Sequence, residues 1–185
     1  MAAKSRKKTW REKLAADHDL PKVIALEAKK AARFGGATMA IPAPREVDAL
    51  MRTVPKGRLT TINELRTAVA KQHRAAVGCP ITTGIFAWIA AHAAEEDAAA
   101  GAKTATPYWR TLKNGGELNP KYPGGIPGVK KKLAAEGHAF VQKGQRTFVR
   151  DFEQSLHSPP APPCSGGIAP TYAIGGHRPP LHISI

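Results

Sequence analysis

The chain is poor in cysteine, in aromatic side chains and in acidic side chains, and it has no long apolar run. Its 185 residues include two cysteines, Cys79 and Cys164, which provide neither a disulfide framework nor the spacing of a metal site. The longest apolar run, residues 84–91, is far shorter than the roughly 20 residues that a membrane span needs. The sequence therefore predicts no metal, no cofactor and no membrane segment.

The N-terminus is basic, with Lys4 and residues 6–8, but no apolar segment follows it. A secretory signal peptide is therefore not expected. Few cysteines and no signal favour a reducing cytoplasm, and the nucleoid if the source is bacterial. The length suits one compact domain with tails, large enough to bury a core without disulfides or metal.

Acidic residues are outnumbered by basic ones, 14 against 28, which gives a formal net charge of +14. An excess of this size indicates a polyanionic partner, and nucleic acid is the usual one. A ribosome-like or merely soluble basic protein fits the same number. Charge alone does not separate DNA from RNA.

Composition divides the chain into three segments. Residues 1–37 are rich in lysine and alanine and favour one or two helices, interrupted near Pro21. Residues 38–156 carry the regular apolar patterns of a folded domain. Residues 157–185 are rich in proline and glycine and carry one formal charge, so we expect them to be disordered; Cys164 has no assigned role there.

Within the domain, a strand is expected over 38–41 and a helix over 44–54. Thr61 and Glu64 form a capping box ahead of a second helix, which fades near residue 73. After a break at 78–80, the spacing predicts a helix over 81–94. Its expected buried stripe is Ile81, Ile85, Trp88 and Ile89.

Two helices joined by such a break favour a helix-turn-helix, although an ordinary helical hairpin fits the same pattern. A flexible insert over 95–105, a short helix over 126–136 and a β-hairpin over 139–152 follow. A hairpin after a helix-turn-helix resembles a wing. The expected fold class is mainly α with a small β component, a winged-helix-like helix-turn-helix DNA-binding domain.

Residues 106–125 carry the most informative motif. Pro107-Tyr108-Trp109-Arg110 precedes a glycine-containing turn, Tyr122-Pro123-Gly124-Gly125, and a helix that ends in Leu133-Ala134-Ala135-Glu136-Gly137. This order resembles the alkylguanine-DNA alkyltransferase family, which has Pro-Cys-His-Arg, Tyr-x-Gly-Gly and Leu-x-x-Glu-Gly at these places. Residues 54–61 also resemble the Ile-Pro-x-Gly segment before the family's helix-turn-helix. The resemblance covers roughly residues 42–137.

The family's chemistry needs a cysteine thiolate, a histidine base and a glutamate that orients the base. Tyr108 stands at the cysteine position and Trp109 at the histidine position, so no catalytic residue is predicted. Glu136 matches the orienting position and is expected to be a structural hydrogen-bond acceptor. The loss of the cysteine resembles the alkyltransferase-like branch, which binds alkylated guanine, flips it and flags it for repair without chemistry. In that branch a tryptophan usually replaces the cysteine and the histidine remains.

Other family landmarks differ. Ile62 stands where the family has a tyrosine that helps to rotate the nucleotide, Thr83 where it has an intercalating arginine, and His92 where it has an asparagine. The resemblance implies DNA contacts at Thr60, Thr61, Thr82, Thr83 and Arg110. A local structural salt bridge is the alternative for Arg110. It implies a lesion pocket formed by Tyr108, Trp109, Tyr122, Gly124 and Gly125.

The resulting hypothesis is a non-catalytic DNA-binding protein that recognises alkylated guanine. Its expected partners are double-stranded DNA, including duplexes with O6-alkylguanine, and a repair protein, and the chain is expected to be a monomer. One alternative is a general nucleic-acid-binding module that kept the fold but not lesion recognition. Another is a methyltransferase that uses Cys79, which precedes a helix N-terminus where thiol pKa values fall. Two questions stay open: whether Tyr108 and Trp109 are core residues, and whether residues 130–132 meet DNA or solvent.

Overall fold

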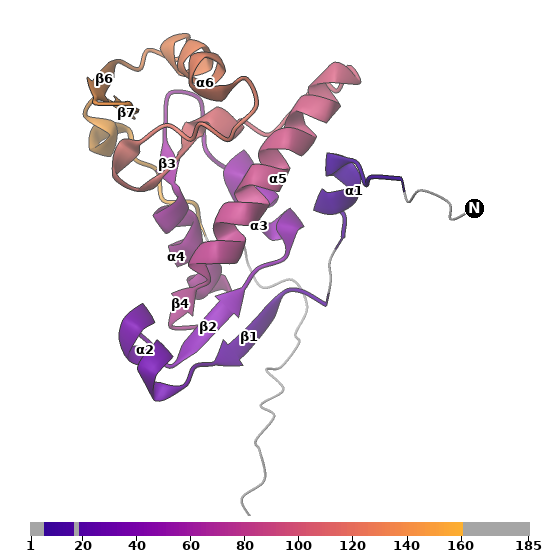
Figure 1. The fold of residues 1–185 in the computed structure, drawn as a ribbon, viewed down its shortest axis with the longest axis vertical. Helices are drawn as coiled ribbons and strands as arrows, with labels where there is room; N and C mark the ends of the chain where they lie inside the picture. The colour runs from indigo at the N-terminus through magenta and orange to yellow at the C-terminus, as the bar shows by residue number, and fades with distance from the viewer. Residues whose placement is uncertain (1–5, 17–18, 161–185) are drawn as a thin grey trace, which may run out of the picture.

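The computed structural model describes residues 6–16 and 19–160. Residues 161–185 of the expected disordered tail, Cys164 among them, lie outside this part. The fold is mainly helical with small sheets, which confirms the expected class (Figure 1). None of the helices described is both long and apolar enough to cross a membrane.

The long helix α5 (Pro80–Ala99) runs through the middle of the molecule (Figure 1). Helices α3 (Pro44–Arg52) and α4 (Ile62–Gln72) pack against it and enclose the hydrophobic core. The first turn of α4 is capped by Thr61, whose hydroxyl accepts from the backbone N–H of Glu64 at 3.3 Å. Only this half of the predicted capping box forms, because the Glu64 carboxylate accepts from Ser158 instead.

The buried face of α5 is not the one predicted. Ile81 and Ile85 are 68% and 46% exposed. The buried face consists of small side chains: Thr83, Ala87, Ala90, Ala91, Ala93 and Ala94. Small side chains let α3 and α4 approach the α5 backbone closely, so an alanine face can lie in the core although it is less hydrophobic than isoleucine.

Helix α5 also continues to Ala99, where a flexible insert was expected from residue 95. Alanine and glutamate are strong helix formers, and the acidic side chains at this end are all engaged. The Glu96 carboxylate accepts from the backbone N–H groups of Trp10 and Arg11, both at 3.0 Å. Asp97 pairs with Arg11 at 2.6 Å.

These contacts hold α1 (Trp10–Leu14) against the C-terminal half of α5 (Figure 1). The Trp10 ring lies edge-on to Trp88, with centroids 4.7 Å apart, and stacks on His92 at 4.4 Å. The N-terminal segment is thus packed onto the domain through an aromatic cluster.

The largest sheet has the order β1-β2-β4. Strand β1 (Lys22–Ala25) pairs antiparallel with β2 (Thr38–Ile41), and α2 (Ala28–Phe34) connects them. Strand β1 replaces part of the helix expected before residue 35, because the β-branched pair Val23-Ile24 favours an extended backbone. The pairing crosses the expected domain boundary at residue 38.

Strand β4 (Val77–Gly78) pairs parallel with β2 and lies within the connection between α4 and α5. Gly78 is required there, because a Cβ would lie 2.3 Å from the carbonyl oxygen of Arg66 on α4. Consecutive helices α4 and α5 therefore pack as expected, but their connection is a strand of the sheet rather than a free turn.

The second half of the domain packs against α5 through the first of its 3-10 helices. The 3-10 helices are η1 (Tyr108–Arg110), η2 (Asn114–Gly116) and η3 (Phe152–Ser155). Strand β3 (Thr60–Thr61) pairs parallel with β5 (Thr111–Leu112). Helix α6 (Gly125–Ala134) precedes the predicted hairpin, β6 (Phe140–Lys143) and β7 (Arg146–Val149), which is confirmed. The hairpin lies beside α6, on the far side of the molecule from β4 (Figure 1).

Candidate functional site

The motif loop folds over the core between α5 and α6. Residues 108–110 form η1, and β5 then aligns the loop with β3, so that Thr111 lies opposite Thr60. The loop ends at Gly124 and Gly125, whose φ angles are +74° and +58°. Other residues rarely adopt this left-handed backbone, so the two glycines allow the turn that starts α6.

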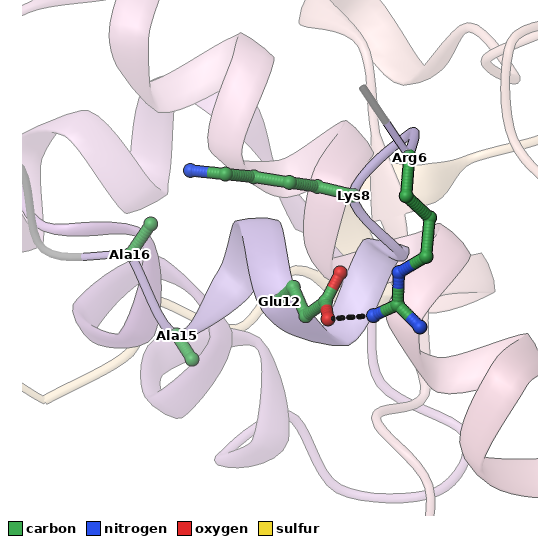
Figure 2. Close-up of a pocket in the computed structure, with 5 residues that line it drawn as sticks. All are labelled: Arg6, Lys8, Glu12, Ala15 and Ala16. Carbon is green, nitrogen blue, oxygen red and sulfur yellow. Dashed lines mark hydrogen bonds and ion pairs between the residues drawn. The ribbon is translucent and has the colours of Figure 1, made fainter. Parts of the chain in front are cut away.

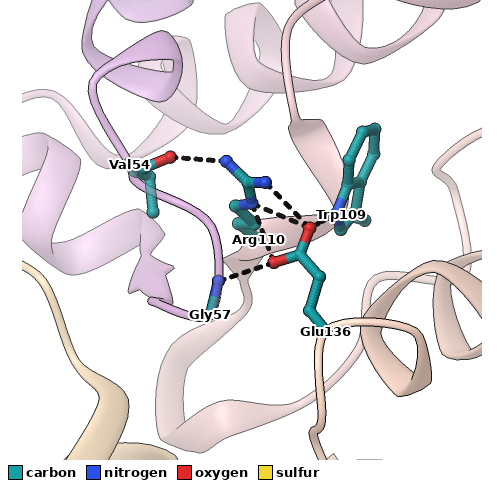
Figure 3. Close-up of polar contacts among 5 residues, drawn as sticks. All are labelled: Val54, Gly57, Trp109, Arg110 and Glu136. Carbon is teal, nitrogen blue, oxygen red and sulfur yellow. Dashed lines mark hydrogen bonds and ion pairs between the residues drawn. The ribbon is translucent and has the colours of Figure 1, made fainter.

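Arg110 and Glu136 form a buried ion pair at the centre of the motif (Figure 3). The guanidinium donates to both carboxylate oxygens, with distances of 2.9–3.0 Å, and its Nη1 donates to the carbonyl of Val54 at 2.8 Å. The backbone N–H of Gly57 donates to Glu136 Oε2 at 3.0 Å. We call these contacts the Arg110–Glu136 node. It joins three motif stretches that lie far apart in the sequence.

Trp109 is part of the same node. Its indole Nε1 donates to Glu136 Oε1 at 2.7 Å (Figure 3). At the position of the expected histidine, tryptophan therefore supplies the hydrogen bond to the glutamate but no base, since indole nitrogen only donates. The prediction that Glu136 is a structural acceptor is confirmed.

The node determines the charge of Glu136. Burial raises the pKa of Glu136, but hydrogen bonds from Arg110, Gly57 and Trp109 outweigh it, and the pKa lies below its ordinary value. The side chains of Arg110 and Glu136 are 13% and 7% exposed. The carboxylate is therefore ionised at neutral pH and compensates a buried guanidinium.

Tyr108 is a core residue, 1% exposed. Its hydroxyl donates to Glu95 Oε1 on α5 at 2.5 Å, and its ring lies edge-on to Trp109 and to Tyr122. Burial, and then the bond to Glu95, raise the pKa of Tyr108 above that of free phenol. The ring fills the position that the resemblance assigns to a reactive thiol.

Lys132 on α6 completes this arrangement. Its Nζ donates to Glu95 Oε1 at 2.7 Å and lies 4.8 Å and 4.7 Å from the ring centroids of Tyr108 and Trp109. The hydrogen bond from Lys132, and then that from Tyr108, lower the pKa of Glu95. Lys132 is therefore partnered within the domain, whereas Lys130 and Lys131 are exposed. Sequence reasoning missed Glu95 because no spacing connects it to the motif.

The predicted lesion pocket is closed in this structure. Tyr108 and Tyr122 are 1% and 2% exposed, and Trp109 is half-buried. Two surface hollows lie elsewhere. One is formed by the N-terminal segment, with Arg6, Lys8, Glu12, Ala15 and Ala16 (Figure 2). The other lies between α4 and β4 and is lined by Asn63, Arg66, Thr67, Ala70, Lys71 and residues 75–78.

The threonines predicted to contact DNA have no hydroxyl directed to solvent. Thr83 is fully buried and donates to the carbonyl of Cys79 at 2.7 Å, and Thr61 caps α4. The hydroxyl oxygens of Thr60 and Thr82 are buried and have no hydrogen-bond partner among the described residues. The four hydroxyls are therefore buried or bonded within the domain, Arg110 is engaged in the node, and contact of these residues with DNA stays a prediction.

Cys79 lies at the other end of α5. It caps the helix, is 8% exposed, and its backbone N–H donates to the carbonyl of Ala40 at 2.8 Å. A rise of about 1.5 Å per residue places it about 24 Å along the helix from Glu95. Cys79 is thus remote from Tyr108 and from the node.

No protein-family model and no curated protein sequence matches the chain. Two solved structures are similar to it. One is S. pombe Atl1 in complex with damaged DNA containing O6-carboxymethylguanine, at 16% identity, and the other is S. pombe ATL in complex with DNA, at 17%. Each similarity covers 63% of this chain and 94% of that chain, with a TM-score of 0.46. A similarity of this extent assigns no ligand or activity to this chain.

Proposed function

We propose that the protein binds duplex DNA, prefers duplexes that contain alkylated guanine, and transfers no alkyl group. The observation that carries the proposal is the Arg110–Glu136 node, which connects the three motif stretches and includes Trp109 at the position of the family's base. The net charge of +14 supports a polyanionic partner. The proposal also holds that the protein acts in the cytoplasm as a monomer and that a repair protein performs the chemistry.

Three features support binding without transfer. The Tyr108 phenol is buried, donates a hydrogen bond to Glu95 and has a raised pKa, so it is not a nucleophile at neutral pH. Trp109 cannot accept a proton. Cys79, the alternative acceptor, lies at the far end of α5.

A preference for damaged DNA does not require an open pocket. An alkylated guanine pairs poorly, and unstacking a damaged pair costs less than unstacking an intact one. A protein that distorts the duplex when it binds therefore favours the damaged site. On this account the closed Tyr108–Tyr122 region supports the fold. The preference for damaged over intact duplexes arises from the lower cost of distorting the damaged DNA.

One observation favours a second candidate, a general nucleic-acid-binding module. The buried rings of Tyr108 and Tyr122 leave no space for a flipped base in this structure. A module of this kind would bind damaged and intact duplexes equally.

Binding and transfer are tested together on short duplexes with one O6-methylguanine. We expect fluorescence anisotropy to detect binding that weakens steadily as salt rises, because phosphate contacts release counterions. We expect the intact mass of the protein to stay unchanged after incubation, with Cys79→Ser as the matched variant. No binding to any duplex would overturn the proposal. Added methyl mass that is absent from Cys79→Ser would establish the methyltransferase alternative.

A further inference from the structure

Strand β1 is the outer edge of the three-stranded sheet (Figure 1). Its pairing partner is β2, and no other described strand is bonded to it. All four of its residues are exposed, and the large apolar side chains among them are Val23 and Ile24, at 39% and 37%. Because successive side chains of a strand point to opposite faces, this end of the sheet is uncovered on both faces. An exposed edge of this kind is a template for pairing with another chain.

The register shows which backbone groups of β1 are free. In an antiparallel pair, every second residue exchanges hydrogen bonds with the neighbouring strand, and the groups of the residues between them point away. The N–H of Leu26 donates to the carbonyl of Ala37 at 2.8 Å, and this bond continues the ladder between β1 and β2. Ile24 therefore bonds to β2, whereas the N–H and C=O groups of Val23 and Ala25 point outward. No hydrogen bond from the described part of the chain uses these outward groups.

The free groups suit a peptide strand better than a phosphate backbone. Val23 and Ala25 each offer one donor and one acceptor along the outer edge. A phosphate oxygen only accepts hydrogen bonds, so a DNA backbone would leave the two carbonyl groups without a donor. An added strand supplies N–H and C=O groups at the same spacing, and it satisfies both groups of both residues.

The charge at this edge selects an acidic strand. Residues 19–37 carry four basic and two acidic side chains, and one of the acids, Glu27, lies 3.5 Å from a lysine of α2. Lys22 is exposed on β1 itself, and α2 exposes Lys29 and Arg33. Lysine on an edge strand discourages pairing between two copies of a chain, because each copy brings its own cations. Opposite charges attract across strands, so the edge favours an acidic partner and opposes a second copy, in agreement with the proposed monomer.

We infer that β1 is the docking strand for an acidic, extended segment of a partner protein. The segment adds to the sheet beside Val23 and Ala25 and places its acidic side chains near Lys22 and α2. The inference rests on the proposed function, which makes this partner a repair protein. Strand β1 lies outside residues 42–137, the part of the chain that resembles the alkyltransferase family, so docking uses none of the motif residues and leaves the Arg110–Glu136 node unchanged.

The test titrates the full chain into two short fluorescent peptides and follows their anisotropy. One peptide alternates valine with glutamate, and the control peptide alternates valine with lysine. Ala25→Pro removes an outward N–H donor and keeps the bonds to β2, since proline is tolerated where the N–H of an edge strand faces solvent. Lys22→Glu reverses the charge of the edge and leaves its backbone unchanged. Circular dichroism and the thermal midpoint confirm that each variant is folded.

We expect the wild type to bind the glutamate peptide and Ala25→Pro to weaken this binding by about tenfold, because a backbone hydrogen bond is lost and the proline ring obstructs the edge. In Lys22→Glu the preference should reverse, so that the lysine peptide binds more tightly. Amide hydrogen exchange followed by NMR locates the contact. Saturating glutamate peptide should slow the exchange of the outward amides of Val23 and Ala25 and leave the amide of Ile24, which is already bonded to β2, unchanged.

Three results would overturn the docking strand. The first is equal binding of both peptides to the wild type, or unchanged affinity for the glutamate peptide in Ala25→Pro. The second is a loss of duplex affinity in Ala25→Pro, which keeps the charge of the edge and would thus assign the edge to DNA. The third is a wild-type dimer in sedimentation equilibrium that Ala25→Pro converts to a monomer, which would assign the edge to a second copy.

The proposed function is tested separately, because the peptide titrations contain no DNA. A wild type that binds duplexes but not the glutamate peptide would overturn the docking strand and leave the proposed function intact. A wild type that binds the glutamate peptide but no duplex would keep the docking strand and remove its link to DNA repair.

Discussion

Replacing Glu136 by glutamine should lower the free energy of unfolding by about 3 kcal/mol, because it leaves a buried guanidinium without its counter-charge. Arg110 is 13% exposed and has its carboxylate partner in Glu136. Glutamine also places an amide donor against the N–H groups of Gly57 and Trp109, which now donate to the carboxylate. Urea denaturation followed by circular dichroism measures the change.

The exposed pair Arg6–Glu12 is the control for this prediction (Figure 2). Its side chains are 80% and 43% exposed, so Glu12→Gln should leave the urea midpoint unchanged. The double variant Arg110→Met/Glu136→Met should lose less stability than the sum of its single variants, because it leaves no buried charge unpaired. An unchanged midpoint for Glu136→Gln would show that the node is not a stabilising element.

The same node predicts a pH dependence. The pKa of Glu136 is lower in the folded protein than in the unfolded chain, so the unfolded state binds more protons between the two values. The stability that Glu136 contributes is therefore complete above the unfolded pKa of about 4.3 and is lost as pH falls through the folded pKa. In Glu136→Gln this part of the acid destabilisation should be absent.

Tyr108→Ala should be the second strongly destabilising change, by about 3–5 kcal/mol. It removes a ring that is 1% exposed and packed on Trp109 and Tyr122, and it leaves a cavity. Thermal and urea unfolding measure the loss. A small effect would place the ring outside the core.

Tyr108→Phe separates packing from hydrogen bonding. It keeps the ring and removes the donor to Glu95, so we expect a loss of about 1.5 kcal/mol, in the range for hydrogen bonds to charged groups. Lys132 remains to compensate Glu95. A loss as large as that of Tyr108→Ala would mean that the hydroxyl, rather than the ring, holds this region together.

The sequence predicts the local features of the site and the fold class. Arg110, Glu136 and the Gly124-Gly125 turn follow from an ordered motif, and the cap at Thr61 follows from spacing within one helical turn. The cap and the turn involve neighbours in the chain, whereas Arg110 and Glu136 were recognised from the order of the motif.

Features that depend on contacts between distant segments were not predicted. The alanine face of α5 is buried because α3 and α4 approach it closely, which a hydrophobicity pattern does not reveal. Glu95 binds Tyr108 and Lys132 from different elements, with no sequence signal linking them. The exposure of Ile81 and Ile85 likewise depends on the position of α1, which packs on Trp88 and His92 of α5 and leaves the start of the helix uncovered.

The central claim is tested most directly by the ratio of two dissociation constants for the wild-type protein. They are measured in competition at fixed salt, for two duplexes that differ only in one O6-methylguanine. The account predicts about tenfold tighter binding to the damaged duplex, because its weakened pair costs less to unstack. Equal constants would contradict lesion recognition and leave a general nucleic-acid-binding module.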